Sequence, residues 1–90
     1  MITVHLPVQL TAEFAANPVL LVEASTGSEM IDGLNRQYPG MASWLIESDG
    51  CFREHLSVFV AGRRLKPRAN ASIPLTDGSE IWILHAISGG

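Results

Sequence analysis

The sequence contains little that would support a disulfide, a membrane span or contact with nucleic acid. Its one cysteine, Cys51, excludes an internal disulfide and a metal site built from several cysteines. No apolar run approaches the roughly 20 residues that cross a bilayer, and the chain begins without the basic start of a signal peptide. Six basic residues against nine acidic ones argue against a general nucleic-acid binder. These absences suit a protein of the reducing cytoplasm.

Motifs for catalysis and metal binding are also missing. The chain has no glycine-rich loop that would cradle a phosphate and no glycine pattern around a serine nucleophile. His5, His55 and His85 could be combined with Cys51 as metal ligands, but only Cys51 and His55 are spaced like a ligand pair. We therefore predict no metal site and no enzymatic centre in this chain, and we expect Cys51 to be a half-buried cysteine without a chemical role.

The first quarter of the chain has the pattern of two strands. Apolar and polar residues alternate over residues 2–6, and a second apolar run covers residues 19–24. Residues 11–18 between them are ambiguous, and we expect a loop or one helical turn there.

The main helix has clear start and stop signals. Thr26 followed by Glu29 is a capping box, in which the hydroxyl and the carboxylate each accept a backbone amide hydrogen at the start of the helix. Apolar residues then recur at helical spacing until Pro39 and Gly40 end the pattern. Gly33 costs about 1 kcal/mol relative to alanine inside a helix, so this helix must depend on packing.

The second half of the chain is mostly strand. Its expected elements are a short helical or irregular segment at 41–48, a strand at 55–62, a basic loop at 63–68 and a last strand at 81–87. We expect Trp44 and Leu45 to cover one end of the core, and a turn at Asp77-Gly78 to precede the last strand. The order is β-β-α-β-β, and the fold class is α+β, with a mixed sheet and one main helix packed on one face.

At this point the chain resembles the ubiquitin-like β-grasp sulfur carriers, the family of MoaD, ThiS and CysO. The resemblance covers residues 1–90 as one domain and is most specific at Asp77-Gly78, in the strand that follows, and at the terminal Gly89-Gly90. The chain departs from the family pattern at Gly27, where a β-branched residue is common, and in the ending HAISGG.

The resemblance implies a carrier chemistry centred on the last residue. Gly90 would be adenylated by an activating enzyme and converted to a thiocarboxylate, and Gly89 would help a flexible tail to thread a narrow channel, because glycine has no Cβ. The chain itself would bind no cofactor, since ATP is used by the partner. The implied partners are a MoeB- or ThiF-like adenylyltransferase and a synthase or sulfhydrylase that accepts the sulfur.

Three functions within this resemblance stay open. The sulfur could go to cysteine or another sulfur metabolite, or the chain could be the small subunit of a molybdopterin synthase. A third alternative is a modifier that forms isopeptide bonds to lysines. The sequence cannot separate the first two, because both need the same glycine tail.

The strand pattern predicts a partner surface independently of the resemblance. If the helix covers the face that carries Ile81 and Ile83, then Phe59, Trp82 and Leu84 lie together on the open face. A contiguous apolar patch of this kind is typical of a docking site. The alternative is that residues 41–48 or the early loop cover it.

The segment RRLKPR, residues 63–68, holds four of the six basic residues. It is either a solvated loop or a contact for an acidic partner surface.

Overall fold

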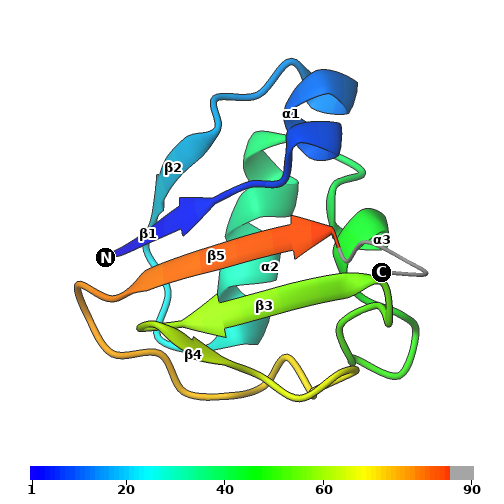
Figure 1. The fold of residues 1–90 in the computed structure, drawn as a ribbon. Helices are drawn as coiled ribbons and strands as arrows, with labels where there is room; N and C mark the ends of the chain where they lie inside the picture. Colours follow the sequence, from blue (N-terminus) through cyan, green and yellow to red (C-terminus); the bar gives the residue numbers. More distant parts are fainter. Residues whose placement is uncertain (86–90) are drawn as a thin grey trace.

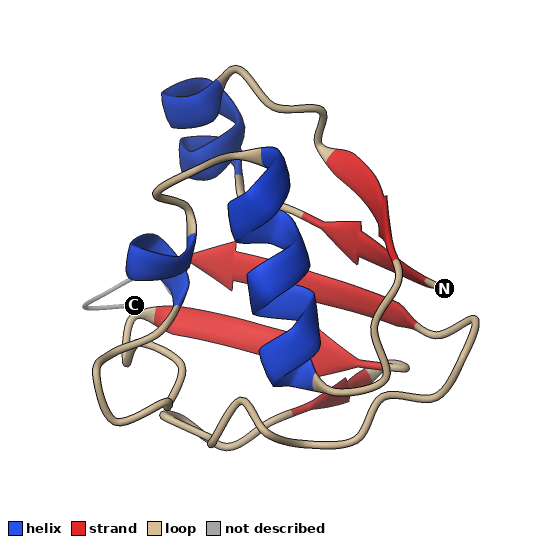
Figure 2. Cartoon of the chain, turned by 180° about the vertical axis from the view of Figure 1, so that it is seen from behind, coloured by secondary structure: helices blue, strands red, loops and turns tan. Residues whose placement is uncertain are grey.

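A computed structural model describes residues 1–85 of the chain. Five strands form one mixed sheet in the order β2-β1-β5-β3-β4. The elements are β1 (Ile2–His5), α1 (Val8–Phe14), β2 (Val19–Val22), α2 (Gly27–Gln37), α3 (Ala42–Leu45), β3 (Leu56–Val60), β4 (Arg63–Arg64) and β5 (Glu80–His85). Figure 1 shows the sheet with α2 behind it, and Figure 2 shows from the opposite side how α2 crosses the strands. One face of the sheet is therefore covered by a helix and the other is open.

The segment between the first two strands forms helix α1, whereas the sequence predicted a loop or a single helical turn at residues 11–18. Helix α1 starts directly after Pro7, buries Leu10, and ends at Ala15, which has a left-handed backbone (φ 51°). The sequence reasoning placed its start too late because Val8 and Gln9 carry no capping signal. After α1 the chain returns to pair β2 antiparallel with β1, in the register Ile2 opposite Val22.

The predicted start of the main helix is confirmed with one correction. The Thr26 hydroxyl accepts a hydrogen bond from the Glu29 amide (3.1 Å), as a capping box requires. The Glu29 carboxylate, however, binds the amide (2.8 Å) and hydroxyl (2.9 Å) of Ser25, one residue before the cap. These bonds to the charged form lower the pKa of Glu29. The helix ends at Gln37, so Tyr38, which the sequence placed on the helical face, is the C-cap residue just before Pro39.

Two glycines in α2 are explained by close approach to neighbouring segments. A Cβ on Gly33 would lie 2.7 Å from Cγ1 of Val22 on β2, so the glycine lets the helix sit low on the sheet. A Cβ on Gly27 would lie 2.2 Å from the carbonyl oxygen of Ala71. The departure from the family pattern at Gly27 therefore has a local cause, because the loop before β5 packs against the start of α2.

Residues 41–48 contain the short helix α3, and they cover the core with only one of the two residues expected. Leu45 is fully buried, together with Met41 at the start of the segment. Trp44 points outward with 40% of its surface exposed, and its ring meets Phe14 of α1 edge to face at 6.2 Å. The expectation that Trp44 covers the core is therefore wrong, since the short helix turns that side chain toward α1.

The basic segment begins as a strand and not as a loop. Arg63 and Arg64 form β4, which pairs antiparallel with Val60 and Phe59 of β3. The connection is the two-residue turn Ala61-Gly62, and both residues have positive φ (50° and 82°). Turns of this kind match the twist of a hairpin, and glycine accepts the second position without strain.

Strand β5 is the centre of the sheet. It pairs parallel with β1 and antiparallel with β3. The core lies between this sheet and α2, and its fully buried side chains include Val4, Leu34, Ile81 and Ile83. No helix among residues 1–85 is long and apolar enough to cross a membrane.

Candidate functional site

The open face of the sheet carries the three residues predicted as a patch. On β5, Ile81 and Ile83 are fully buried, whereas Trp82 and Leu84 are 44% and 41% exposed. Phe59 is half-buried and lies directly opposite Trp82 in the β3–β5 register. Neither residues 41–48 nor the early loop shields Trp82 and Leu84 from solvent. The structure thus brings Phe59, Trp82 and Leu84 to one face, and their role in docking stays a prediction.

The indole of Trp82 is held by a neighbour on β1. The ring of His5 stacks on it in parallel, with 3.6 Å between the ring centroids and 2° between the planes. Nε2 of His5 lies 2.7 Å from Oε1 of Glu80, which precedes Trp82 by two residues on the same face. His5 is therefore fixed from both sides, and it limits the rotamers that Trp82 can adopt. An anchor that is already ordered loses less side-chain entropy when a partner binds it.

Two apolar residues extend the patch to the edge of the sheet. Val19 and Leu21 on β2 are 48% and 64% exposed, and they lie opposite His5 and Thr3 in the register of β1 and β2. We call Val19, Leu21, Phe59, Trp82 and Leu84 the open-face patch. The sequence reasoning missed the two β2 members. The sequence carried no signal for them, because a continuous apolar run such as VLLV does not tell which residues face outward.

Polar groups surround the open-face patch. Arg64 of β4 shares the face with Phe59 and donates from its guanidinium to the Ser57 hydroxyl at 3.3 Å. Glu80 lies on the opposite side of Trp82 from Leu84 along β5. An apolar centre with a charged border is the usual anatomy of a protein interface.

The predicted reactive residue, Gly90, and its neighbour Gly89 lie outside the described residues. The last described residue is His85 at the end of β5, so the strand with Trp82 and Leu84 is also the strand that leads toward the two glycines in sequence. His85 packs its ring against that of His55 at 5.2 Å. Burial, with a smaller electrostatic contribution from the neighbouring His55 ring, lowers the pKa of His85 and favours its neutral form.

The histidines and Cys51 do not come together as metal ligands. His5 is stacked on Trp82, while His55 and His85 form a separate pair. Across residues 1–85, no group of three or more histidine, cysteine, aspartate or glutamate side chains is arranged to hold a metal ion. Cys51 is half-buried, and its backbone forms an isolated antiparallel β-bridge with Asn70.

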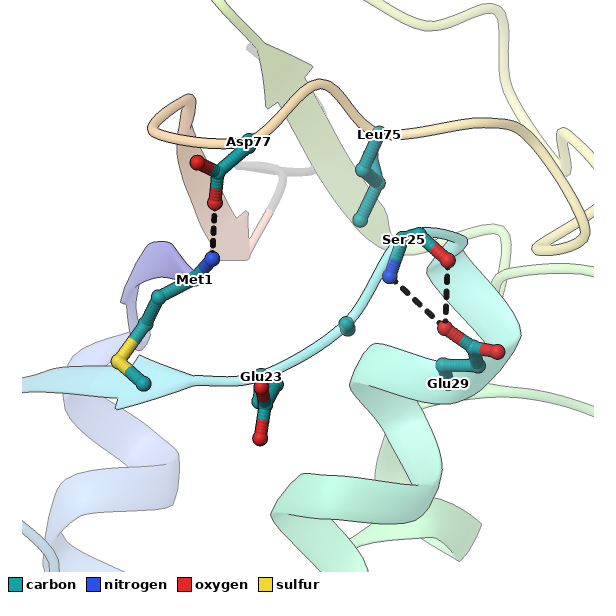
Figure 3. A pocket seen from close by; sticks show the side chains of 7 residues that line it. Met1, Glu23, Ser25, Glu29, Leu75 and Asp77 are labelled. Atoms are coloured by element: carbon teal, nitrogen blue, oxygen red, sulfur yellow. Dashed lines mark hydrogen bonds and ion pairs between the residues drawn. The ribbon is translucent and has the colours of Figure 1, made fainter.

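A small acidic depression lies beside Met1, at the start of β1 (Figure 3). Its volume is about 250 Å³, and its lining includes Glu23, Ser25, Glu29 and Asp77. The carboxylates of Glu29 and Asp77 are already bound, to Ser25 and to the Met1 ammonium. This ammonium lowers the pKa of Asp77. Two of the three carboxylates in the depression thus support the helix cap and the turn before β5.

Comparison with known proteins connects this fold to solved structures. No protein-family model matches the chain, and no curated protein matches it. A chain of the Amycolatopsis orientalis BexX/CysO complex matches with a TM-score of 0.85 and 21% identity, over 100% of both chains. CysO of Mycobacterium tuberculosis, described as an antigen, matches with a TM-score of 0.85 and 20% identity, over 97% of this chain and 100% of that one.

The archaeal modifier proteins share the same architecture at lower similarity. Small archaeal modifier protein 1 of Haloferax volcanii matches with a TM-score of 0.71 and 22% identity, over 99% of this chain and 98% of that chain. At such identities the likeness establishes the fold. The α+β, ubiquitin-like β-grasp architecture predicted from the sequence is confirmed.

Proposed function

We propose that this chain is a sulfur-carrier protein of the MoaD, ThiS and CysO type, which delivers sulfur as a thiocarboxylate on Gly90. The observation that supports this most is the match of its fold to CysO structures along 97% or more of the chain. The glycine pair Gly89-Gly90 and the exposed apolar residues Trp82 and Leu84 on the strand before it also support the proposal.

The proposed chemistry has two steps. A carboxylate oxygen of Gly90 attacks the α-phosphorus of ATP, which forms an acyl-adenylate and releases pyrophosphate. A sulfide equivalent then adds to the acyl carbon and expels AMP, which leaves a thiocarboxylate. Activation is necessary because a carboxylate is a poor electrophile, and it takes place on an adenylyltransferase that binds ATP. The chain is thus a co-substrate, and its partners supply the catalysis.

The open-face patch is proposed as the surface that docks on the activating enzyme. Trp82 is its central anchor, because it is exposed, aromatic and already oriented by His5. Docking through β5 would present the residues that follow this strand to the partner's nucleotide site. The proposed recipient of the sulfur is a synthase or sulfhydrylase that makes cysteine or another sulfur metabolite.

Intact mass spectrometry tests the carrier function. The chain is incubated with ATP, sulfide and a MoeB- or ThiF-like activating enzyme, and we expect a mass increase equal to one exchange of oxygen for sulfur. A variant with one alanine added after Gly90 is the matched control, and it should fold normally but gain nothing. The proposal is wrong if the extended variant gains sulfur at its end, or if the native chain forms neither adenylate nor thiocarboxylate.

A second candidate function is protein modification, and the similarity to small archaeal modifier protein 1 favours it. In that case Gly90 would form an isopeptide bond to a lysine of another protein, with loss of AMP from the same adenylate. Peptide mapping after co-expression with the activating enzyme separates the two. Because no basic residue follows Arg68, the digest uses chymotrypsin, which cuts after Leu84 and leaves the remnant HAISGG on a modified lysine. Such a remnant supports modification, whereas a thiocarboxylate without it supports the carrier.

A further inference from the structure

A second surface feature lies at the other edge of the sheet from β2, along β4. It is an open groove of about 510 Å³ between the β3–β4 hairpin and the segment that precedes β5. The lining residues are Val60, Arg63, Arg64, Leu65, Lys66, Ile73 and Pro74. We call it the β4 groove. None of these residues belongs to the open-face patch, although Arg64 lies opposite Phe59 at its border.

The β4 groove concentrates positive charge in an acidic protein. Three of the six basic residues line it, and no acidic residue does, although the chain holds nine. Within residues 1–85, no carboxylate forms an ion pair with Arg63, Arg64 or Lys66. By contrast, Arg68 binds Asp49 at 3.0 Å and approaches Glu47 at 3.6 Å. Of the basic segment 63–68, Arg68 is therefore paired within the fold, whereas the three basic residues of the groove remain available to a partner.

The floor of the groove is apolar. It consists of three half-buried side chains that pack against the edge of the hydrophobic core: Val60, Leu65 and Ile73. They are rigidly placed, because Leu65 donates its amide to Val58 at 2.8 Å and the carbonyl of Ile73 accepts from Gly27 at 2.9 Å. Flexible cationic side chains around a fixed apolar floor suit a ligand that has an apolar residue between anionic groups.

We propose that the β4 groove is a docking site for an acidic segment of a partner protein, in which carboxylates flank one or two aliphatic residues. The carboxylates would pair with Arg63, Arg64 and Lys66, and the aliphatic residues would cover Val60, Leu65 and Ile73. Extension of the sheet contributes little, because β4 has only two residues and Pro67 follows soon after. Nucleic acid fits less well, since the lining has no aromatic residue to stack on a base and the chain as a whole repels phosphate. This inference stands whether or not the carrier function is correct.

Nuclear magnetic resonance titration of the full chain tests the proposal with defined peptides. The probe is the capped peptide EDLIDE, and its controls are EDSSDE, which lacks the aliphatic residues, and KRLIKR, which reverses the charge. We expect shifts of the amides of Val60, Leu65 and Ile73 with EDLIDE, weaker binding of EDSSDE and none of KRLIKR. Added salt should weaken binding of EDLIDE, because the contacting charges are exposed.

Two charge reversals locate the site. Arg63→Glu should weaken binding of EDLIDE by about five- to tenfold, because it removes one attraction and adds one repulsion. Arg36→Glu, in the last turn of α2, makes the same change in net charge outside the groove and should change the affinity by less than about twofold. Lys66→Glu gives an independent second variant, and the amide spectrum of each shows whether it is folded.

Several outcomes would overturn the proposal. One is the absence of shifts in the groove with EDLIDE, and another is an equal effect of Arg36→Glu and Arg63→Glu. Shifts centred on Trp82 and Leu84 would assign the peptide to the open-face patch. Tighter groove binding by an oligouridylate than by EDLIDE would make the surface a nucleic-acid site.

Discussion

The two faces of β5 carry equally apolar residues with opposite fates. Ile81 and Ile83 are fully buried under α2, whereas Trp82 and Leu84, which alternate with them, remain substantially exposed. Burial of an aliphatic or aromatic side chain is worth about 1.5–3 kcal/mol. The covered face uses this free energy for folding, and the open face leaves it available for a partner. The alternation of side chains thus gives one strand a face that contributes to stability and a face that is proposed for recognition.

The largest effect on stability should come from truncating a buried side chain on the covered face of β5. Replacement of Ile83 by alanine should lower the free energy of unfolding by about 2–5 kcal/mol, because it leaves a cavity in a packed core. Replacement of the adjacent Leu84 by alanine should cost less than about 1 kcal/mol. Urea unfolding of both variants measures the difference. Equal losses would mean that the two faces are not energetically distinct.

The next largest effect concerns binding through the open face. Trp82→Ala should weaken docking on the activating enzyme by about 2 kcal/mol or more if Trp82 is the central anchor, while unfolding changes by less than about 1 kcal/mol. Titration calorimetry measures the affinity. Acrylamide quenching of a Trp44→Phe background first checks that Trp82 is accessible. An unfolded Trp82→Ala protein would place this residue in the core.

Contact between α2 and β2 offers a test of how tightly the covered face is packed. By helix propensity alone, Gly33→Ala should stabilise α2 by about 1 kcal/mol, because alanine is more favourable than glycine inside a helix. The new Cβ would lie 2.7 Å from Cγ1 of Val22, a stiff branched side chain, and overpacking costs about 1–3 kcal/mol. We expect net destabilisation, measured by thermal unfolding. If Gly33→Ala is more stable than the native chain, α2 has room to move away from the sheet.

The smallest effect is a pH dependence at the start of α2. The pKa of Glu29 is lowered by hydrogen bonds from Ser25, so the folded chain binds fewer protons there than the unfolded chain. Its stabilising contribution is therefore present above the ordinary range for glutamate and is lost as the pH falls through the lowered value. Glu29→Gln should reduce the drop in thermal midpoint on acidification. Glu23→Gln, whose carboxylate lines the same depression, should leave the drop unchanged.

Much of the candidate site could be predicted because strand alternation is local. The positions of Ile81, Trp82 and Leu84 follow from the direction of successive side chains once one face is assigned to the core. The stacking of His5 on Trp82 could not be predicted in this way. It depends on the parallel pairing of β1 with β5, which joins residues 77 positions apart and leaves no local signal.

The sequence by itself determined the α+β class, the start and end of the main helix, and the apolar character of both faces of the last strand. These follow from propensity, capping and periodicity, which act over a few residues. Only the tertiary structure decided that Gly27 must make room for Ala71, that Trp44 turns toward Phe14, and that Arg63 and Lys66 line one groove with Ile73. The physical reason is that each of these contacts joins segments whose approach is set by packing of the whole core, and packing is a property of the folded chain.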